Sequence, residues 1–316
     1  MKNKVFKAVK ITLGVLAVLA VAGTVAISGV VADKIIHQND GKDTHDNSLK
    51  QLEVWGYDEE AFEKRYQGRE ISAVATDGNK VPASFFDGEK DECVIIVHGA
   101  GGDRVSAYPL AEAYIERGYD VIAIDQRGCG KNESDEVTFG IREKADVSAV
   151  VKFAKEELDE EKVIVHGQSM GAQTVMLYAA DVKAGASDAA DAVICDSPVP
   201  GMELILKEMF GDGDTKSFTA NFLVGGSKLF SKLFFGLDFE EGDTIAKAAE
   251  DELPTLVICS EKDEVCLPDQ VKEMYDNISS DKKQFASFDS AHIEGIIDEP
   301  EAYMDCVEGF FDEIGL

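Results

Sequence analysis

The chain has 316 residues, 45% of them hydrophobic, and it carries 61 acidic against 31 basic side chains, a net charge of −30. So large an acidic excess repels phosphate backbones and anionic headgroups, which argues against nucleic acid as a partner. The sequence holds no internal repeat, P-loop, paired C-x-x-C or dinucleotide-binding glycine fingerprint, and no metal-ligand spacing, so we predict neither a cofactor nor a metal.

The first predicted element is an apolar segment. Four lysines lie within the first ten residues, and residues 11–32 follow without a charge. As a helix these 22 residues would be about 33 Å long, enough to span a bilayer. A cleavable signal peptide has a shorter apolar core of roughly 7 to 15 residues. We therefore predict that residues 1–32 form an uncleaved, single-pass anchor in the cell membrane, with the catalytic domain extracytoplasmic. Secretion after cleavage is the alternative, because small residues at Ala26 and Ala32 offer cleavage sites.

Residues 33–69 are polar, and we expect a stalk that includes a helix over residues 49–66. From residue 70 to 316, short apolar runs alternate with helix-like runs, the pattern of a parallel sheet with helices on both faces. The predicted strands are 71–76, 81–86, 92–97, 120–124, 162–166, 192–195, 254–260 and 283–288. The predicted helices are 105–117, 142–158, 172–180, 268–278 and 300–314. A turn at residues 77–80 predicts that the first two strands form an antiparallel hairpin at the sheet edge.

Residues 167–171 read G-Q-S-M-G between a predicted strand and a predicted helix. A strand, a glycine-rich turn and a helix are the surroundings of a nucleophile elbow. The two glycines let the backbone turn tightly enough to hold the serine in a strained conformation with its hydroxyl projecting above the sheet. We therefore predict Ser169 as a nucleophile.

A serine hydroxyl is a poor nucleophile near neutral pH, so it needs a base and a group that orients the base. After such an elbow, the chain order is serine, then Asp or Glu, then His. Of the five histidines only His292 follows Ser169, just after the last predicted strand, so it is the candidate base. The strand before that one leads into the candidate acid, Asp263, with Glu261 and Glu264 as rivals.

A tetrahedral intermediate also needs preorganised N–H donors for its oxyanion. Residues 98–102 (H-G-A-G-G) follow a fully apolar predicted strand, and such a turn leaves backbone N–H groups uncovered. We predict the N–H groups of Ala100 and Met170 as the two donors, with Gly101 as the alternative to Ala100. His98 is expected to be a structural histidine.

The chain resembles the α/β-hydrolase family, in particular its esterase, monoacylglycerol lipase and serine aminopeptidase branch. The resemblance covers about residues 70–316, and its motifs are HGAGGD at 98–103, DQRGCG at 125–130, GQSMG at 167–171, Asp263 and His292. It implies an eight-stranded, mostly parallel sheet flanked by helices and a cofactor-free Ser-His-Asp mechanism. Asp125, Arg127 and Gly128 are expected to brace their turn. The sequence departs from the family pattern at Gln168, where a His is usual, and at Ser134, a serine displaced from its usual place after the second motif.

The resemblance also implies a helical cap between the strands at 192–195 and 254–260, which we place at residues 198–252. Seven of the chain's 17 phenylalanines lie there, at positions 210, 218, 222, 230, 234, 235 and 239. They could simply pack the cap onto the domain, or they could form an apolar wall over Ser169. Collectively they favour a small hydrophobic ester as substrate.

The sequence thus predicts a membrane-anchored serine hydrolase, of the carboxylesterase or lipase type, that cleaves esters of hydrophobic acyl groups through an acyl-enzyme. One alternative is a peptidase or amidase that acts on short peptides, and another is a non-catalytic surface module. Cys93, Cys195 and Cys259 fall on predicted buried strands, which favours free thiols. The oligomeric state is left open.

Overall fold

The computed structural model describes residues 2–40 and 42–316, and the side chains of residues 2–9, 11–18 and 20 lie outside this description. The chain forms two compact units. One, here called the helical unit, comprises Met1–Gln38 and Glu203–Glu240, and the other, the sheet unit, comprises Asn39–Met202 and Glu241–Leu316.

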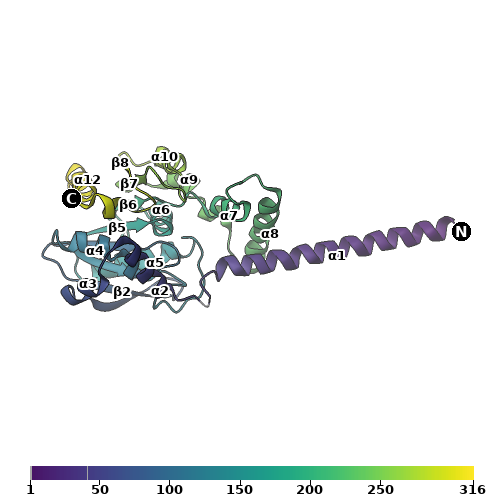
Figure 1. Ribbon diagram of the computed structural model, residues 1–316, viewed down its shortest axis with the longest axis horizontal. Helices are drawn as coiled ribbons and strands as arrows, with labels where there is room; N and C mark the ends of the chain where they lie inside the picture. Colours follow the sequence, from purple (N-terminus) through teal and green to yellow (C-terminus); the bar gives the residue numbers. More distant parts are fainter. Residues whose placement is uncertain (1, 41) are drawn as a thin grey trace. The chain divides into compact units, whose positions relative to one another are not determined.

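The sheet unit is built on an eight-stranded sheet in the order β1-β2-β4-β3-β5-β6-β7-β8 (Figure 1). The strands are β1 (Arg69–Val74), β2 (Lys80–Phe86), β3 (Glu92–Val97), β4 (Asp120–Ile124), β5 (Lys162–Gln168), β6 (Ala192–Asp196), β7 (Thr255–Ser260) and β8 (Lys283–Phe288). β2 pairs antiparallel with β1 and with β4, and every other neighbouring pair is parallel. The predicted edge hairpin and the eight-stranded, mostly parallel sheet are therefore confirmed.

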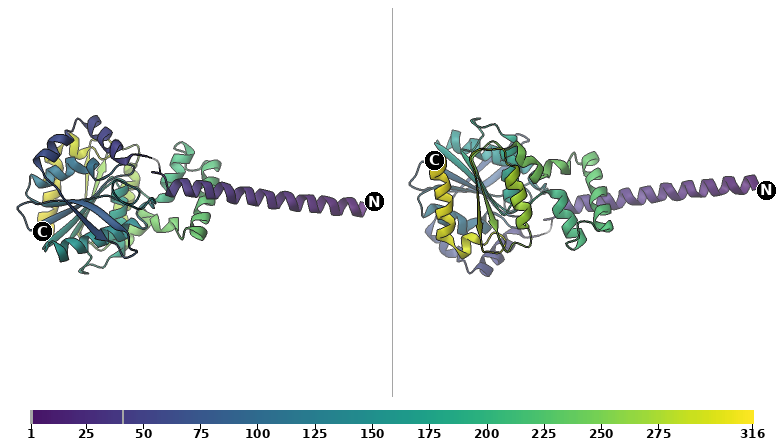
Figure 2. Two further views of the ribbon diagram at one scale, coloured as in Figure 1. Left: turned by 90° about the horizontal axis from the view of Figure 1, so that it is seen from below. Right: turned by 90° about the horizontal axis from the view of Figure 1, so that it is seen from above.

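Helices cover both faces of this sheet (Figure 2). One face packs against α2 (Thr44–Trp55), α3 (Glu59–Arg65), α4 (Tyr108–Ile115), α11 (Gly295–Asp298) and α12 (Pro300–Ile314). The helices α5 (Glu143–Glu157) and α6 (Met170–Asp181) contact each other and the strands of the sheet. The remaining helices are α9 (Thr244–Lys247) and α10 (Pro268–Asn277), with short 3-10 turns at Arg104–Ala107, Phe239–Gly242 and Ala248–Glu250.

The central strands are apolar on both faces, because helices cover both. In β3 the residues from Cys93 to Val97 are at most 1% exposed, and β4, β6 and β7 are buried throughout. Near-continuous apolar runs of this kind are typical of parallel strands. The carboxyl ends of β5, β7 and β8 lead directly into the loops that carry the candidate site residues.

Residues 44–65, expected in a polar stalk, belong to the sheet unit. The segment expected as one helix forms two, because Gly56 adopts φ +68° after α2 and the side chain of Asp58 caps α3. Leu52 of α2 and Phe62 of α3 are almost fully buried. Phe62 stacks on Tyr108, with ring centroids 4.2 Å apart. These two apolar side chains hold the otherwise polar segment against the sheet unit.

The helical unit contains α1 (Lys2–Ile36), α8 (Phe218–Phe234) and most of α7 (Met202–Gly211). α8 lies close against the C-terminal part of α1. A Cβ added at Gly29 would lie 2.9 Å from the ring of Phe230, and one at Gly226 would lie 2.3 Å from Ser28 Oγ. Glycine at these positions therefore permits the close approach. The seven phenylalanines of the predicted cap all fall within this unit.

The predicted anchor at residues 11–32 lies in α1, and its residues 11–18 and 20 are outside the described side chains. Across the part of the chain that is described, no helix combines the length and the apolar character that crossing a membrane requires.

Candidate active site

Ser169 lies at the sharp turn between β5 and α6. Its backbone angles are φ 57° and ψ −120°, a conformation that is costly for a residue with a side chain. The turn is fixed by the Ser169 N–H, which donates to the Asp196 carbonyl at 2.9 Å. A Cβ at Gly171 would lie 2.0 Å from the Val97 carbonyl oxygen, and one at Gly167 would lie 2.4 Å from the Gly171 carbonyl oxygen. Only glycine fits at both positions, which explains the G-x-S-x-G pattern physically.

The structure brings Ser169, His292 and Asp263 together from three loops. His292 Nε2 lies 2.8 Å from Ser169 Oγ, and His292 Nδ1 lies 2.7 Å from Asp263 Oδ2. The rivals of Asp263 lie elsewhere. Glu261 accepts a hydrogen bond from the Ser287 hydroxyl at 2.8 Å, and Glu264 is exposed. The distances thus select Asp263 among the three carboxylates as the partner of the imidazole.

Asp263 is held as a carboxylate by its surroundings. Its Oδ1 accepts the backbone N–H groups of Val265 and Cys266, both at 2.8 Å. Burial raises the pKa of the Asp263 carboxyl, but the hydrogen bond and charge of His292 and these two N–H groups outweigh burial and hold the pKa below its ordinary value. An ionised Asp263 can fix the His292 tautomer with its proton on Nδ1, which leaves Nε2 free to accept the Ser169 proton.

The loop predicted to supply the oxyanion donors lies against the nucleophile. A Cβ at Gly99 would be 3.3 Å from the Ser169 Cβ, and Ala100 lines the same cavity as Ser169. Met170 is the first residue of α6, where backbone N–H groups lack partners within the helix. The Met170 residue as a whole is buried.

His98 stabilises the same loop through its hydrogen bonds. It is completely buried, and burial lowers its pKa. Its Nδ1 lies 2.7 Å from the Gly99 carbonyl, and its Nε2 accepts the Gln126 N–H at 3.1 Å. These contacts fit a neutral ring that donates through Nδ1, consistent with the structural role expected for His98. Gln126 also donates through Nε2 to the His98 carbonyl at 2.6 Å.

The D-x-R-G turn is held by its own charged groups, as expected. The Asp125 carboxylate accepts two backbone N–H groups at 3.0 and 2.9 Å. Arg127 makes a two-pronged contact with Asp146, at 2.8 and 2.7 Å, and a further ion pair with Asp77. Gly128 takes φ +68°. None of these groups lines the cavity at Ser169.

A cavity of about 460 Å³ opens at Ser169, a size typical of ligand pockets. α2 forms one of its walls. Asn47 donates to the Gly101 carbonyl at 2.9 Å, and the Trp55 indole N–H donates to Glu294 at 2.9 Å. The helix is therefore fastened both to the glycine loop and to the loop that carries His292. The lining residues are Asn47, Ser48, Gln51, Trp55, Gly99, Ala100, Gly101, Gly102, Ser106, Gln168, Ser169, Val265, His292 and Ile293.

The α2 side chains that line this cavity were not among the site residues predicted from the sequence. A segment with so many charged and amide side chains is expected to be exposed to solvent. The available signal was the pair of apolar residues, Leu52 and Phe62, that anchor the segment in the core.

Asp196, at the end of β6, is a second buried carboxyl beneath the elbow. It accepts hydrogen bonds from the Tyr303 hydroxyl at 2.9 Å and from Gln168 Nε2 at 3.3 Å. Burial raises the pKa of Asp196 to about 6. Gln168 thus has a structural partner at the position where the family usually carries His.

Within the described residues, Asp263, Cys266 and His292 are the group whose ligand atoms, all within 4.8 Å of one another, could hold a metal ion. Both ring nitrogens of His292 already hydrogen bond to Asp263 and Ser169, so a hydrogen-bonded triad accounts for this group. None of the six cysteines, all of which lie in the described residues, forms a disulfide. Burial raises the pKa of the Cys129 thiol to about 12 and of the Cys259 thiol to about 11.

Comparisons with known proteins point to one fold. A family model for the alpha/beta hydrolase fold matches residues 92–223. The uncharacterised protein YqkD of Bacillus subtilis is 26% identical over 223 residues, which cover 70% of this chain and 71% of that protein. The esterase Pf2001 of Pyrococcus furiosus matches with a TM-score of 0.64 at 21% identity, over 81% of this chain and 96% of that one. A puromycin hydrolase matches with a TM-score of 0.58 at 19% identity, over 78% of this chain and 39% of that one.

Proposed function

We propose that this chain, which belongs to the α/β-hydrolase family, is a serine hydrolase that cleaves carboxylic esters through an acyl-enzyme. The observation that carries the proposal is the continuous hydrogen-bonded series from Ser169 Oγ through His292 to Asp263, at 2.8 and 2.7 Å. These distances lie within the range in which an imidazole can take a proton from a hydroxyl. The strained backbone of Ser169 supports the same role, because such strain is concentrated at functional sites.

In the first half of the reaction, Ser169 Oγ attacks the carbonyl carbon of the ester and its proton passes to His292 Nε2. Asp263 balances the charge of the imidazolium. The negative charge that develops on the carbonyl oxygen is held by the backbone N–H groups of Ala100 and Met170. His292 then gives its proton to the ester oxygen, the C–O bond breaks, and the alcohol leaves.

In the second half, water attacks the acyl carbonyl carbon while His292 takes one of its protons. The bond between the acyl carbon and Ser169 Oγ breaks, and His292 returns the proton to that oxygen. The acid leaves and the enzyme is restored. Each step uses only side chains and N–H groups of the sheet unit.

We propose a hydrophobic acyl group as the substrate's acid part. Trp55, Val265 and Ile293 provide apolar surface in the cavity at Ser169. The seven phenylalanines at positions 210–239 also favour a hydrophobic substrate, on the evidence of the sequence alone.

The acyl preference predicts that kcat/KM rises along a series of p-nitrophenyl esters from acetyl to hexanoyl. Each buried CH₂ contributes about 0.8 kcal/mol, close to fourfold, before losses to imperfect packing. Val265→Ala or Ile293→Ala, which remove apolar surface from the cavity at Ser169, should flatten this rise more than they lower acetyl-ester turnover. Val74→Ala, which removes an exposed apolar side chain from β1, is the control and should keep the wild-type slope.

The alternative is a peptidase or amidase acting on short peptides, and it uses the same triad. A panel of esters and aminoacyl amides separates the two. The ester proposal requires faster turnover of the best ester than of any aminoacyl amide. If kcat/KM stayed flat or fell with acyl chain length, or if amides were cleaved faster than esters, the peptidase function would be favoured instead.

We propose from the sequence that residues 1–32 hold the enzyme at the cell membrane with the sheet unit outside the cytoplasm. The support is the uncharged run at residues 11–32 behind four lysines. The full-length chain should remain in the membrane pellet after carbonate extraction. Protease added to intact cells should digest the sheet unit. Recovery in the soluble fraction of the cell, or full protection from the protease, would contradict this placement.

A further inference from the structure

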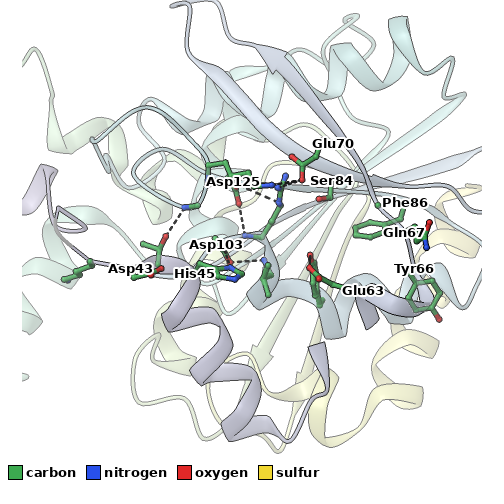
Figure 3. Close-up of a pocket in the computed structure, with 18 residues that line it drawn as sticks. Asp43, His45, Glu63, Tyr66, Gln67, Glu70, Ser84, Phe86, Asp103 and Asp125 are labelled. Atoms are coloured by element: carbon green, nitrogen blue, oxygen red, sulfur yellow. Dashed lines mark hydrogen bonds and ion pairs between the residues drawn. The ribbon is translucent and has the colours of Figure 1, made fainter. Parts of the chain in front are cut away.

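A second cavity, of about 930 Å³, lies in the sheet unit on another side of α2. His45 of α2 lines this cavity, whereas Ser48, Gln51 and Trp55 line the one at Ser169. In Figure 3, Asp43 and His45 lie toward one end of it, and Tyr66 and Gln67 lie toward the other. The triad is not among its lining residues, so the proposed mechanism leaves this cavity without a role.

The buried wall of this cavity includes a guanidinium with an unused nitrogen. Arg104 is only 4% exposed. Its Nη2 donates to Glu70 at 2.6 Å, and its Nε lies 3.8 Å from Asp125. Its Nη1 is buried and has no hydrogen-bond partner among the described residues. A buried, charged N–H group without an acceptor is costly, so an anionic group that reached Arg104 would find a cation whose hydrogen-bonding capacity is not filled.

Glu70 shows what kind of group the wall accepts. Its Oε1 takes hydrogen bonds from Arg104 Nη2 at 2.6 Å and from Lys131 Nζ at 2.9 Å. The Glu70 side chain is 55% exposed, so it can swing away without disturbing the core. Burial raises the pKa of the Glu70 carboxyl, but the bonds from Lys131 and Arg104 outweigh burial and hold the pKa below its ordinary value. Two cationic groups therefore converge on one carboxylate oxygen, which belongs to a partly exposed side chain.

The other residues that line the cavity restrict the charge and the shape of a ligand that could bind there. Phe86 and Tyr108 are buried, and with Tyr66 they supply aromatic surface. Glu63 and Asp43 add negative charge, and the whole chain carries −30. These charges disfavour a multiply charged anion such as phosphate. A single carboxylate on an apolar body meets both conditions.

We propose that this cavity binds a small organic monoanion. Its carboxylate takes the place of the Glu70 carboxylate on Arg104 and Lys131, and its apolar body lies against Phe86 and Tyr108. The site does not depend on turnover at Ser169. Because α2 borders both cavities, a ligand here would contact one side of the helix and the substrate the other.

The test is calorimetric titration of the full-length Ser169→Ala protein, which cannot consume ligand, with benzoate as the probe. Benzoate should bind, while neutral benzamide and inorganic phosphate should bind more weakly. Lys131→Gln should weaken benzoate binding by about fivefold, the effect of losing one partly exposed ion pair. Glu70→Gln should strengthen binding by about fivefold, because it removes the internal competitor.

Lys80→Gln and Glu133→Gln make the same charge changes at exposed positions outside the cavity and should leave the affinity within twofold. If the ion pair between Glu70 and Lys131 were merely structural, the two substitutions would not change the affinity for benzoate in opposite directions. Failure of benzoate to bind, equal binding of benzamide, tighter binding of phosphate, or weaker binding by the Glu70→Gln protein would each overturn the proposal.

Discussion

Replacing Ser169 with Ala is expected to lower kcat for ester hydrolysis by about 10⁴-fold or more, because the acyl-enzyme can no longer form. The fold should survive. The turn is fixed by the Ser169 backbone N–H and by Gly167 and Gly171, none of which the substitution removes. Initial rates with a p-nitrophenyl ester measure the loss, and thermal unfolding checks that the variant is folded.

Ser106→Ala is the matched control, since Ser106 is another serine that lines the same cavity. Its hydroxyl donates to the Asp103 carbonyl rather than to His292, so the variant should stay within about tenfold of wild type. Substantial activity in a folded Ser169→Ala protein would place the nucleophile elsewhere.

Asp263→Asn is expected to lower kcat by roughly 10³- to 10⁴-fold. An amide in this position cannot stabilise the imidazolium, and it can donate to Nδ1, which favours the wrong tautomer of His292. Binding of substrate depends on other groups, so KM should change far less than kcat. Steady-state kinetics on the best ester of the acyl series measure both constants.

Glu264→Gln and Glu261→Gln remove the neighbouring carboxylates and should each cost less than about threefold, as surface substitutions usually do. Both residues are exposed, and Glu261 hydrogen bonds to Ser287 instead of His292. A crippled Glu264→Gln enzyme with an active Asp263→Asn enzyme would move the acid by one residue.

Local sequence patterns were enough to predict the sheet and the candidate triad. The strands at 92–97, 120–124 and 283–288 have the same bounds in the structure as in the sequence prediction, because each is a short apolar or alternating run between turn residues. Ser169 could be singled out because the elbow is a local structure. His292 followed from chain order, and Asp263 could be ranked above Glu261 and Glu264 only by preference until distances were known.

Long-range packing is what the sequence did not disclose. The polar segment around α2 forms one wall of the cavity at Ser169 and is fastened through Asn47 and Trp55, whose partners Gly101 and Glu294 are 54 and 239 residues away. The composition of a segment indicates whether it is exposed to solvent, but it does not indicate which distant loop the segment contacts. The pairing of residues 1–38 with 203–240 in the helical unit is likewise a tertiary fact, made by Gly29 and Gly226 at close contacts.

The role of Ser169 as the nucleophile is tested by mass spectrometry of peptides from the wild-type protein after treatment with a fluorophosphonate, which reacts with activated serine nucleophiles. We predict a single adduct on the peptide containing Ser169, formed in parallel with loss of esterase activity, and absent in the Asp263→Asn protein over the same time. No adduct, or an adduct on another serine with Ser169 unmodified, would contradict it.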